Sequence, residues 1–177
     1  MRARVEPVRL LALDVDGVLT DGGLYYLDHE GLEAKRFHAR DGLGIRLLLE
    51  SGLLVGWITA RRSELVAKRA RELGITFLHQ GAHDKWRCLR DQLRGLSLEP
   101  DQCAYMGDDL VDLAVMQRVG LAAAPGDAHP EAIRAAHWVA SEGGGRGAVR
   151  ALIDTILQIQ GHWPAILERM SAASGAP

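Results

Sequence analysis

The chain has 177 residues, of which 47% are hydrophobic and 25% charged, and its formal net charge is −2. This is long enough for one domain with a substantial core, and the near balance of charge argues against a nucleic-acid binder or a polybasic membrane module. No apolar run approaches the ~20 residues of a membrane span, and none follows the basic N-terminus as in a secretory signal. Cys88 and Cys103 stand apart without metal-like spacing, so we expect reduced thiols in a cytoplasmic protein.

The first strong pattern is an apolar run that ends in two carboxylates. It predicts a buried strand over residues 8–15 that carries Asp14 and Asp16 at its carboxyl end, with Gly17 next. Alternation along the strand places both carboxylates on one side, at the edge where parallel sheets bind ligands. Their repulsion needs a cation or a shared proton, and Mg²⁺ suits oxygen ligands best. The alternative is a strand followed by an ordinary Asp- and Gly-rich turn.

A short hairpin is predicted directly behind these carboxylates. Its strands would cover residues 24–27 and 32–38, with a turn at Asp28–Gly31. The insertion, about residues 22–38, is too small for a separate cap domain and would expose apolar side chains and open edges. The hairpin therefore either pairs with other subunits or packs on its own domain.

The rest of the chain alternates strands with helices of about ten residues. Asp41 and Ser63 are expected to cap two of these helices, and Gly74 to end the second of them. The alternation predicts right-handed crossovers and one parallel sheet covered on both faces, a three-layer α/β fold over residues 1–177. The tail, about residues 161–177, is rich in small residues and is expected to be mobile without a partner. Helices are predicted over 40–50, 64–73, 84–94, 110–118, 130–136 and 148–160, and strands over 53–59, 75–78, 104–106, 121–123 and 137–140.

Polar side chains follow several of the predicted strands. Thr59 ends one strand, Lys85 comes just after the next, and Asp108 and Asp109 follow a third. Parallel strands present their carboxyl ends at one rim, so these groups should meet Asp14 there. Phosphoryl transfer needs charge neutralisation and positioning, which a hydroxyl, an ammonium and a carboxylate-held Mg²⁺ supply. Each feature alone has an ordinary explanation, such as a helix cap or a solvated lysine.

Together, in this order, the motifs resemble those of the haloacid dehalogenase superfamily, mostly Mg²⁺-dependent phosphatases. The matching residues are Asp14-Val-Asp-Gly-Val-Leu-Thr-Asp-Gly, Thr59, Lys85 and Gly107-Asp-Asp-x-x-Asp. The resemblance implies a Rossmann-like fold in which Asp14 is the nucleophile and Asp16 the general acid/base. It further implies that Thr59 and Lys85 hold phosphate oxygens. The implied metal ligands are the carboxylates of Asp14 and Asp108 and the backbone carbonyl of Asp16, while Asp109 and Asp112 orient other groups.

A narrower resemblance covers most of the chain, from Leu13 to about Gly161. The sequence is similar to the capless 3-deoxy-D-manno-octulosonate (KDO) 8-phosphate phosphatases, which serve lipopolysaccharide synthesis. Ala60 departs from their usual glycine. Members are homotetramers whose hairpins form a central barrel and whose subunits help cover one another's active sites. The further matching segments are Gly31-Leu-Glu-Ala-Lys-Arg-Phe, Arg40-Asp-Gly-Leu-Gly, Ile58-Thr-Ala-Arg-Arg-Ser, Gln80-Gly and Gly144-Gly-Arg-Gly-Ala-Val-Arg.

The resemblance leaves alternatives for the substrate and its contacts. Arg61 is the expected partner of the sugar carboxylate, and an arginine here goes with octulosonate rather than nonulosonate 9-phosphate enzymes. Arg69 either binds the sugar, in its own or an adjacent subunit, or is a solvated helix charge, and a solvated charge is also the alternative for Arg61. Arg146 and Arg150 either add charge above the site or merely follow a glycine-rich loop. A nonulosonate 9-phosphatase and a non-catalytic assembly subunit remain as alternatives, and the absence of a large cap disfavours a phosphomutase.

Overall fold

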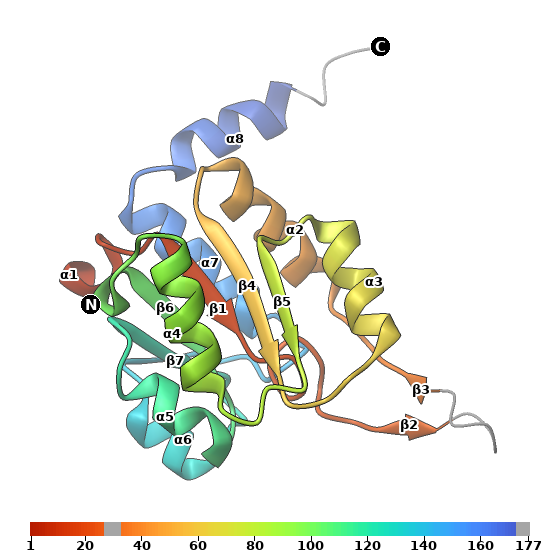
Figure 1. Cartoon of the computed structure of the whole chain (residues 1–177). Coiled ribbons are helices and arrows are strands. Elements are labelled where there is room, and N and C mark those ends of the chain that lie inside the picture. Colours follow the sequence, from red (N-terminus) through yellow and green to blue (C-terminus); the bar gives the residue numbers. More distant parts are fainter. Residues whose placement is uncertain (27–32, 173–177) are drawn as a thin grey trace.

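The apolar runs form a parallel sheet of six strands in the order β5-β4-β1-β6-β7-β8, which confirms the predicted α/β class (Figure 1). The computed structural model describes residues 1–26 and 33–172. β1 lies centrally, with Leu13 beside Trp57 of β4 and Met106 of β6. The carboxyl ends of these three strands are therefore level with one another. The strands are β1 Leu10–Leu13, β4 Leu54–Thr59, β5 Phe77–Gln80, β6 Cys103–Met106, β7 Leu121–Ala124 and β8 Trp138–Val139.

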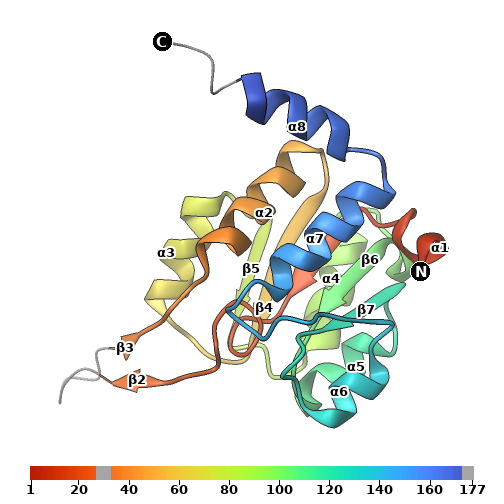
Figure 2. The same cartoon turned by 180° about the vertical axis from the view of Figure 1, so that it is seen from behind.

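The sheet is buried on both faces, which explains why its strands are continuously apolar. In β1, Leu11 and Leu13 belong to one core cluster and Leu10 and Ala12 to the other. Figures 1 and 2 show the two helical layers from opposite sides. The first cluster includes residues of α2 (Ala39–Glu50), α3 (Glu64–Leu73) and α7 (Ala148–Ile159), and the second includes residues of α4 (Lys85–Gly95), α5 (Leu113–Met116) and α6 (Pro130–Ala135).

Local signals fixed some helix ends correctly and one wrongly. Ser63 caps α3 by accepting a hydrogen bond from Val66 N, and Gly74 ends that helix with φ of 69°. Asp41, in contrast, is not a cap of its own helix, which begins one residue after His38. Asp41 lies buried inside the first turn of α2 and accepts a hydrogen bond from Arg150 N of α7 at 2.9 Å. The prediction failed because a tertiary partner competes for its carboxylate.

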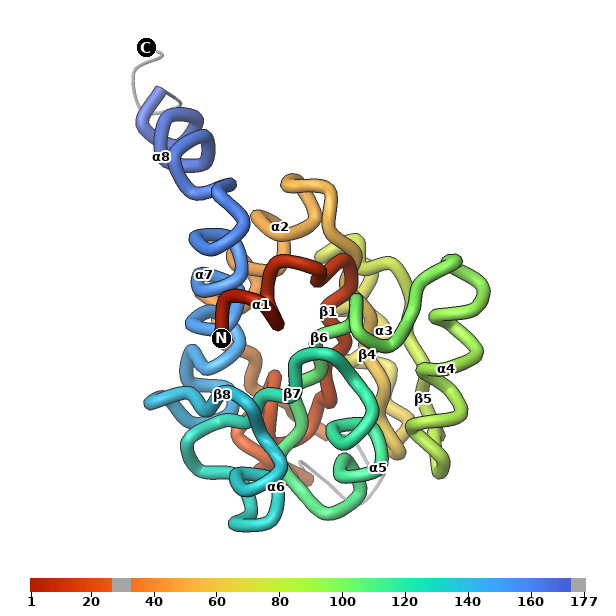
Figure 3. The backbone as a smooth tube through the Cα atoms, turned by 90° about the vertical axis from the view of Figure 1, so that its left-hand side faces the viewer, coloured from red at the N-terminus to blue at the C-terminus, as the bar shows by residue number. Residues whose placement is uncertain are grey.

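Two other segments differ from the predicted ones. The helix expected over 110–118 begins as a 3₁₀ turn, η2 (Leu110–Asp112), and continues only as the four-residue α5. The tail expected to be mobile contains α8 (Trp163–Ala172), in which Ile166 is buried. α8 is attached to α2 by Arg169, whose Nη2 lies 2.6 Å from Glu50 Oε2. Figure 3 shows α8 continuing beyond α7, away from the sheet. Two short elements were not predicted, α1 (Arg2–Val5) and η1 (Pro100–Gln102).

The hairpin is present and projects from the carboxyl end of the sheet (Figures 1 and 2). Its strands β2 (Tyr25–Tyr26) and β3 (Glu33–Ala34) are antiparallel, with Tyr25 opposite Ala34. The predicted turn at 28–31 and the outer ends of both strands lie outside the described residues. Both cysteines are free, as expected. None of the described helices has the length and apolar character required to cross a membrane.

Candidate active site

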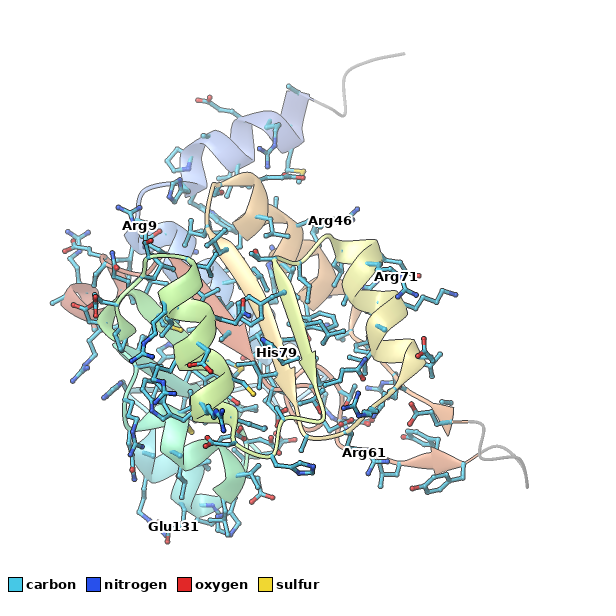
Figure 4. All side chains as sticks on the ribbon, in the orientation of Figure 1. Arg9, Arg46, Arg61, Arg71, His79 and Glu131 are labelled. Carbon is cyan, nitrogen blue, oxygen red and sulfur yellow. The ribbon has the colours of Figure 1, made fainter. Side chains whose placement is uncertain are left out.

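A small open cavity lies at the carboxyl ends of the central strands. Its volume is about 170 Å³. Figure 4 shows Arg61 at this end of the sheet, below β4 and β5 and on the side from which β2 projects. The structure therefore brings together the side chains that four separate sequence motifs predicted. The lining residues are Asp14, Asp16, Thr59, Ala60, Arg61, Lys85, Asp108, Asp109 and Val111.

Lys85 joins the first and fourth motifs at the base of the cavity. Its Nζ lies 2.8 Å from Asp14 Oδ2 and 2.7 Å from Asp112 Oδ1, and its side chain is 3% exposed. Burial alone would lower the pKa of Lys85, but Asp14 and Asp112 together raise it above its usual value. Lys85 is therefore a permanent positive charge beside Asp14, as binding of phosphate oxygens requires.

Asp112 holds this arrangement from below. Its Oδ1 accepts hydrogen bonds from Lys85 Nζ and from Tyr105 Oη at 2.6 Å. Its Oδ2 accepts from the backbone N–H groups of Asp108, at 3.0 Å, and Asp109, at 3.2 Å. The carboxylate is fully buried and each oxygen already has two donors. Asp112 thus contacts both Lys85 and the Asp108 loop, and its orienting role stays a prediction.

Carboxylates of the cavity form a group that can hold a cation, and two of them have an oxygen without a hydrogen-bond partner among the described residues. Carboxylate oxygens of Asp14, Asp108 and Asp112 lie within 4.8 Å of one another, a group that fits a metal ion. Asp108 Oδ1 and Asp16 Oδ2 are both buried, and neither has a hydrogen-bond partner within residues 1–26 and 33–172. Since Asp112 is saturated by donors, Asp14 and Asp108 are the side chains best placed to hold the ion. Hard carboxylate oxygens of this kind suit Mg²⁺.

The electrostatics of this carboxylate cluster also favour a bound cation. Burial, followed by the charge of Asp112, raises the pKa of Asp14 to about 6 despite the contact with Lys85. Burial, followed by the charges of Asp14 and Asp112, raises the pKa of Asp108 to about 8. One lysine does not neutralise three clustered carboxylates. A divalent ion would supply the missing charge and lower the pKa of both groups, which favours their ionised forms.

Thr59 and Arg61 occupy the rim contributed by β4. Thr59 is 2% exposed, and its Oγ1 accepts a hydrogen bond from Arg61 N at 3.2 Å. This contact fixes the turn that carries both residues, with Ala60 at the position where relatives were expected to have glycine. The Arg61 side chain is thereby available at the cavity mouth for an anionic group of the ligand.

The remaining predicted arginines lie elsewhere in the single chain. Arg69 contacts the start of α2, close to Gly42, and pairs with Glu72 at 3.2 Å. Arg150 pairs with Asp154 at 2.7 Å, and Arg146 is exposed. None of these three lines the cavity of its own subunit. Their roles toward a sugar remain predictions.

Two residues of the site were not assigned roles from the sequence. Tyr105 is a buried residue of β6 that donates to Asp112, and its position inside an apolar strand gave no signal of this. Lys35 forms an ion pair with Asp16 Oδ1 although it follows the hairpin strand β3. Lys35 lies in the segment Gly31-Leu-Glu-Ala-Lys-Arg-Phe, which resembles the family and so marked this region as a candidate for function. The spacing of the sequence, however, does not indicate a contact between Lys35 and Asp16.

Comparisons with known proteins agree with this geometry. Residues 56–152 match the family model described as haloacid dehalogenase-like hydrolase. The chain is 49% identical over 159 residues to the 3-deoxy-D-manno-octulosonate 8-phosphate phosphatase of Escherichia coli strain K12, covering 90% of this chain and 84% of that protein.

Solved structures show the same likeness. The 3-deoxy-D-manno-octulosonate 8-phosphate phosphatase of Yersinia pestis is 47% identical with a TM-score of 0.88, covering 91% of this chain and 86% of that one. The corresponding enzyme of Moraxella catarrhalis, solved with magnesium, phosphate and KDO, is 36% identical with a TM-score of 0.93, covering 96% and 97%. The chain therefore belongs to the haloacid dehalogenase-like hydrolases and, within them, to the family of the 3-deoxy-D-manno-octulosonate 8-phosphate phosphatases.

Proposed function

We propose that this protein is a Mg²⁺-dependent phosphatase that hydrolyses KDO 8-phosphate to KDO and phosphate in lipopolysaccharide precursor synthesis. The observation that carries the proposal is the gathering of Asp14, Thr59, Lys85 and Asp108 around one cavity. Family membership narrows the reaction to this ester. The carboxylates of Asp14 and Asp108 and the backbone carbonyl of Asp16 are the proposed protein ligands of Mg²⁺.

The first half-reaction transfers the phosphoryl group to the protein. A carboxylate oxygen of Asp14 attacks phosphorus, the bond to the sugar oxygen breaks, and Asp16 donates a proton to that oxygen. Thr59 and Lys85 hold the non-transferred oxygens. When bound, Mg²⁺ supplies positive charge that aligns the phosphate and offsets its repulsion from Asp14.

The second half-reaction releases phosphate. Asp16 removes a proton from water, the water oxygen attacks the aspartyl phosphate, and the bond between phosphorus and Asp14 breaks. Lys85 stays paired with Asp112 throughout and keeps its charge beside the phosphoryl oxygens.

Recognition of the sugar is assigned to Arg61, whose guanidinium can pair with the substrate carboxylate at the cavity mouth. Arg69 is proposed to serve an adjacent subunit, because it does not line its own cavity. A nonulosonate 9-phosphate is the alternative substrate, and steady-state rates on both esters discriminate between them. We expect a cytoplasmic homotetramer assembled through the hairpin.

The decisive test is phosphate release from KDO 8-phosphate and other sugar-acid phosphates, with and without EDTA. We expect Mg²⁺-dependent release that is fastest with KDO 8-phosphate, and loss of turnover in Asp14→Asn. Release at the parent rate by Asp14→Asn would show that the nucleophile is misassigned. No release from any ester with Mg²⁺ present would instead favour a non-catalytic assembly subunit.

A further inference from the structure

A buried lysine next to the hairpin strand β3 contacts Asp16, the carboxylate proposed as general acid/base. Lys35 follows β3 directly, yet its side chain is only 1% exposed and its ammonium is paired with Asp16 Oδ1. The next residue, Arg36, behaves differently. Its side chain is 58% exposed and lies 3.9 Å from Asp21, as in an ordinary surface pair.

Burying a lysine ammonium is costly unless the geometry compensates for lost hydration. In the described part of the chain, the ammonium groups of Lys35 and Lys85 are both buried, and each is paired with a carboxylate of the first motif, which offsets the lost hydration. Lys85 contacts Asp14, and Lys35 contacts Asp16. The two carboxylates that carry the proposed chemistry therefore each have a lysine, and the two lysines come from different parts of the chain.

The contact with Lys35 distinguishes the two oxygens of Asp16. Oδ1 is occupied by the ammonium, whereas Oδ2 is buried and has no hydrogen-bond partner among the described residues. A carboxylate held at one oxygen cannot rotate freely, so the other oxygen is presented in one direction. Oδ2 is then the atom that gives a proton to the sugar oxygen and takes one from water.

We propose that Lys35 is a positioning residue that fixes the rotation of Asp16 and so makes the catalytic proton transfers depend on the placement of the hairpin. The inference rests on the proposed function, in which Asp16 is the general acid/base. In the hydrolytic step, Asp16 Oδ2 accepts a proton from water and the oxygen bonds to phosphorus. The bond from phosphorus to Asp14 breaks, and its electron pair returns to the Asp14 carboxylate.

The test uses Lys35→Met, which keeps the apolar stem and removes the charge, with Arg36→Met as matched control. Each is assayed in the full protein with Mg²⁺ on KDO 8-phosphate and on p-nitrophenyl phosphate. Nitrophenolate departs without needing a proton, so p-nitrophenyl phosphate makes the first step independent of Asp16 while the second still requires it. Thermal unfolding verifies that each variant is folded, and Lys35→Gln takes the place of Lys35→Met if the latter is not.

We expect Lys35→Met to lower steady-state turnover of both esters at least tenfold. With p-nitrophenyl phosphate it should still release a rapid burst of one nitrophenolate per subunit, because the phosphoenzyme forms and then persists. Arg36→Met should retain turnover within about twofold of the parent.

Three results would overturn the inference: unchanged turnover, a raised KM with unchanged kcat, or loss of the burst together with turnover. The last would mean that Lys35 serves substrate binding or hairpin folding rather than Asp16. If the parent hydrolyses p-nitrophenyl phosphate but not KDO 8-phosphate, the proposed substrate is wrong while the burst still tests Lys35. If the parent hydrolyses neither ester, the proposed function itself fails.

Discussion

The carboxylates at the end of the sheet have different hydrogen-bond and ion-pair partners, so they are suited to different roles. Asp112 is saturated by donors, and Asp14 contacts Lys85 and the Val15 N–H. Asp108 retains a buried oxygen that has no hydrogen-bond partner among the described residues. The residue type is the same in each case, so burial and neighbouring groups decide which carboxylate orients and which can bind a cation.

The raised pKa of Asp108 predicts a pH-dependent stability. In the Mg²⁺-free protein the pKa of Asp108 is about 8, compared with an ordinary value of 3.8. At pH values between these two, the folded protein keeps a proton on Asp108 that the unfolded chain has lost. The free energy of unfolding should therefore fall as pH rises from 6.5 to 8. The slope of this fall is at most about 1.4 kcal/mol per pH unit. We expect a smaller slope, because Asp108 is only half-buried and solvent screens its charge.

Urea unfolding at several pH values measures this slope. Saturating Mg²⁺ should abolish it, since the ion favours ionised Asp108, and Asp108→Asn should abolish it without the ion. A free energy of unfolding that rises with pH in the Mg²⁺-free parent would contradict the assignment.

Gly17 predicts a specific loss of Mg²⁺ affinity on substitution. Its φ is +91°, and a Cβ at this position would lie 2.0 Å from Asp108 Oδ2. Gly17→Ala should displace Asp108 and weaken Mg²⁺ activation at least tenfold. Gly52→Ala is the matched control, because φ is +85° there and, apart from its chain neighbours, no atom of the described residues lies within 4 Å of the added carbon.

Both glycine substitutions should cost about 1–2 kcal/mol of stability through backbone strain. Only Gly17→Ala should shift the Mg²⁺ concentration for half-maximal phosphate release. Equal Mg²⁺ dependence in the two variants would show that the Asp108 contact is unimportant.

At the scale of elements, the glycine-rich loop before α7 packs against the loop that follows β1. Gly145 N donates to Val18 O at 2.9 Å, and a Cβ on Gly144 would lie 1.8 Å from Gly17 O. Asp127 holds the loop from the other side by accepting from Gly144 N at 2.9 Å. The loop thus supports the backbone next to Asp16, whereas Arg146 stays exposed.

Asp41 joins α2 to the start of α7 and predicts a graded loss of stability. Its Oδ1 accepts from Arg150 N in the first turn of α7, as a cap supplied by another helix. Asp41→Ala should lower the free energy of unfolding by about 1–2 kcal/mol. Asp41→Asn should cost less than half of that, because the amide oxygen still accepts. Urea unfolding compares them, and equal losses would mean that the charge of Asp41 matters rather than the hydrogen bond.

At the scale of the whole molecule, the hairpin leaves large apolar side chains in water. Leu24, Tyr25 and Tyr26 are 48%, 47% and 67% exposed, and they lie on the segment that projects from the sheet. Such a patch, on strands whose edges are open, is typical of an assembly surface. It supports the proposed tetramer.

The assembly proposal predicts that a charge on the hairpin separates the subunits. Tyr26→Asp should lower the mass measured by light scattering from that of four subunits, because an aspartate cannot be buried cheaply in an apolar interface. Val139→Asp, on the exposed strand β8, is the control and should retain the parent mass. A Tyr26→Asp protein with the same mass as the parent would place the interface elsewhere.

The layered fold was predictable because its signals are local and repeated. Apolar runs, Ser63 and Gly74 each act within a few residues, so periodicity and caps locate most elements. Asp41 and α8 were misjudged for the opposite reason. Asp41 accepts a hydrogen bond from Arg150 N, which lies far away in sequence. Helix α8 is stabilised by burial of Ile166 and by the ion pair between Arg169 and Glu50.

By itself, the sequence determined the α/β class, the order of the motifs and the residues Asp14, Thr59, Lys85 and Asp108, because parallel strands bring whatever follows them to one edge. Only the tertiary structure decided which oxygens are occupied. In the folded chain, Asp112 accepts hydrogen bonds from Lys85 and Tyr105, and Asp16 forms an ion pair with Lys35. Lys85 begins α4, Tyr105 lies in β6 and Lys35 follows the hairpin strand β3. No local spacing rule specifies these contacts, because they depend on how the elements pack.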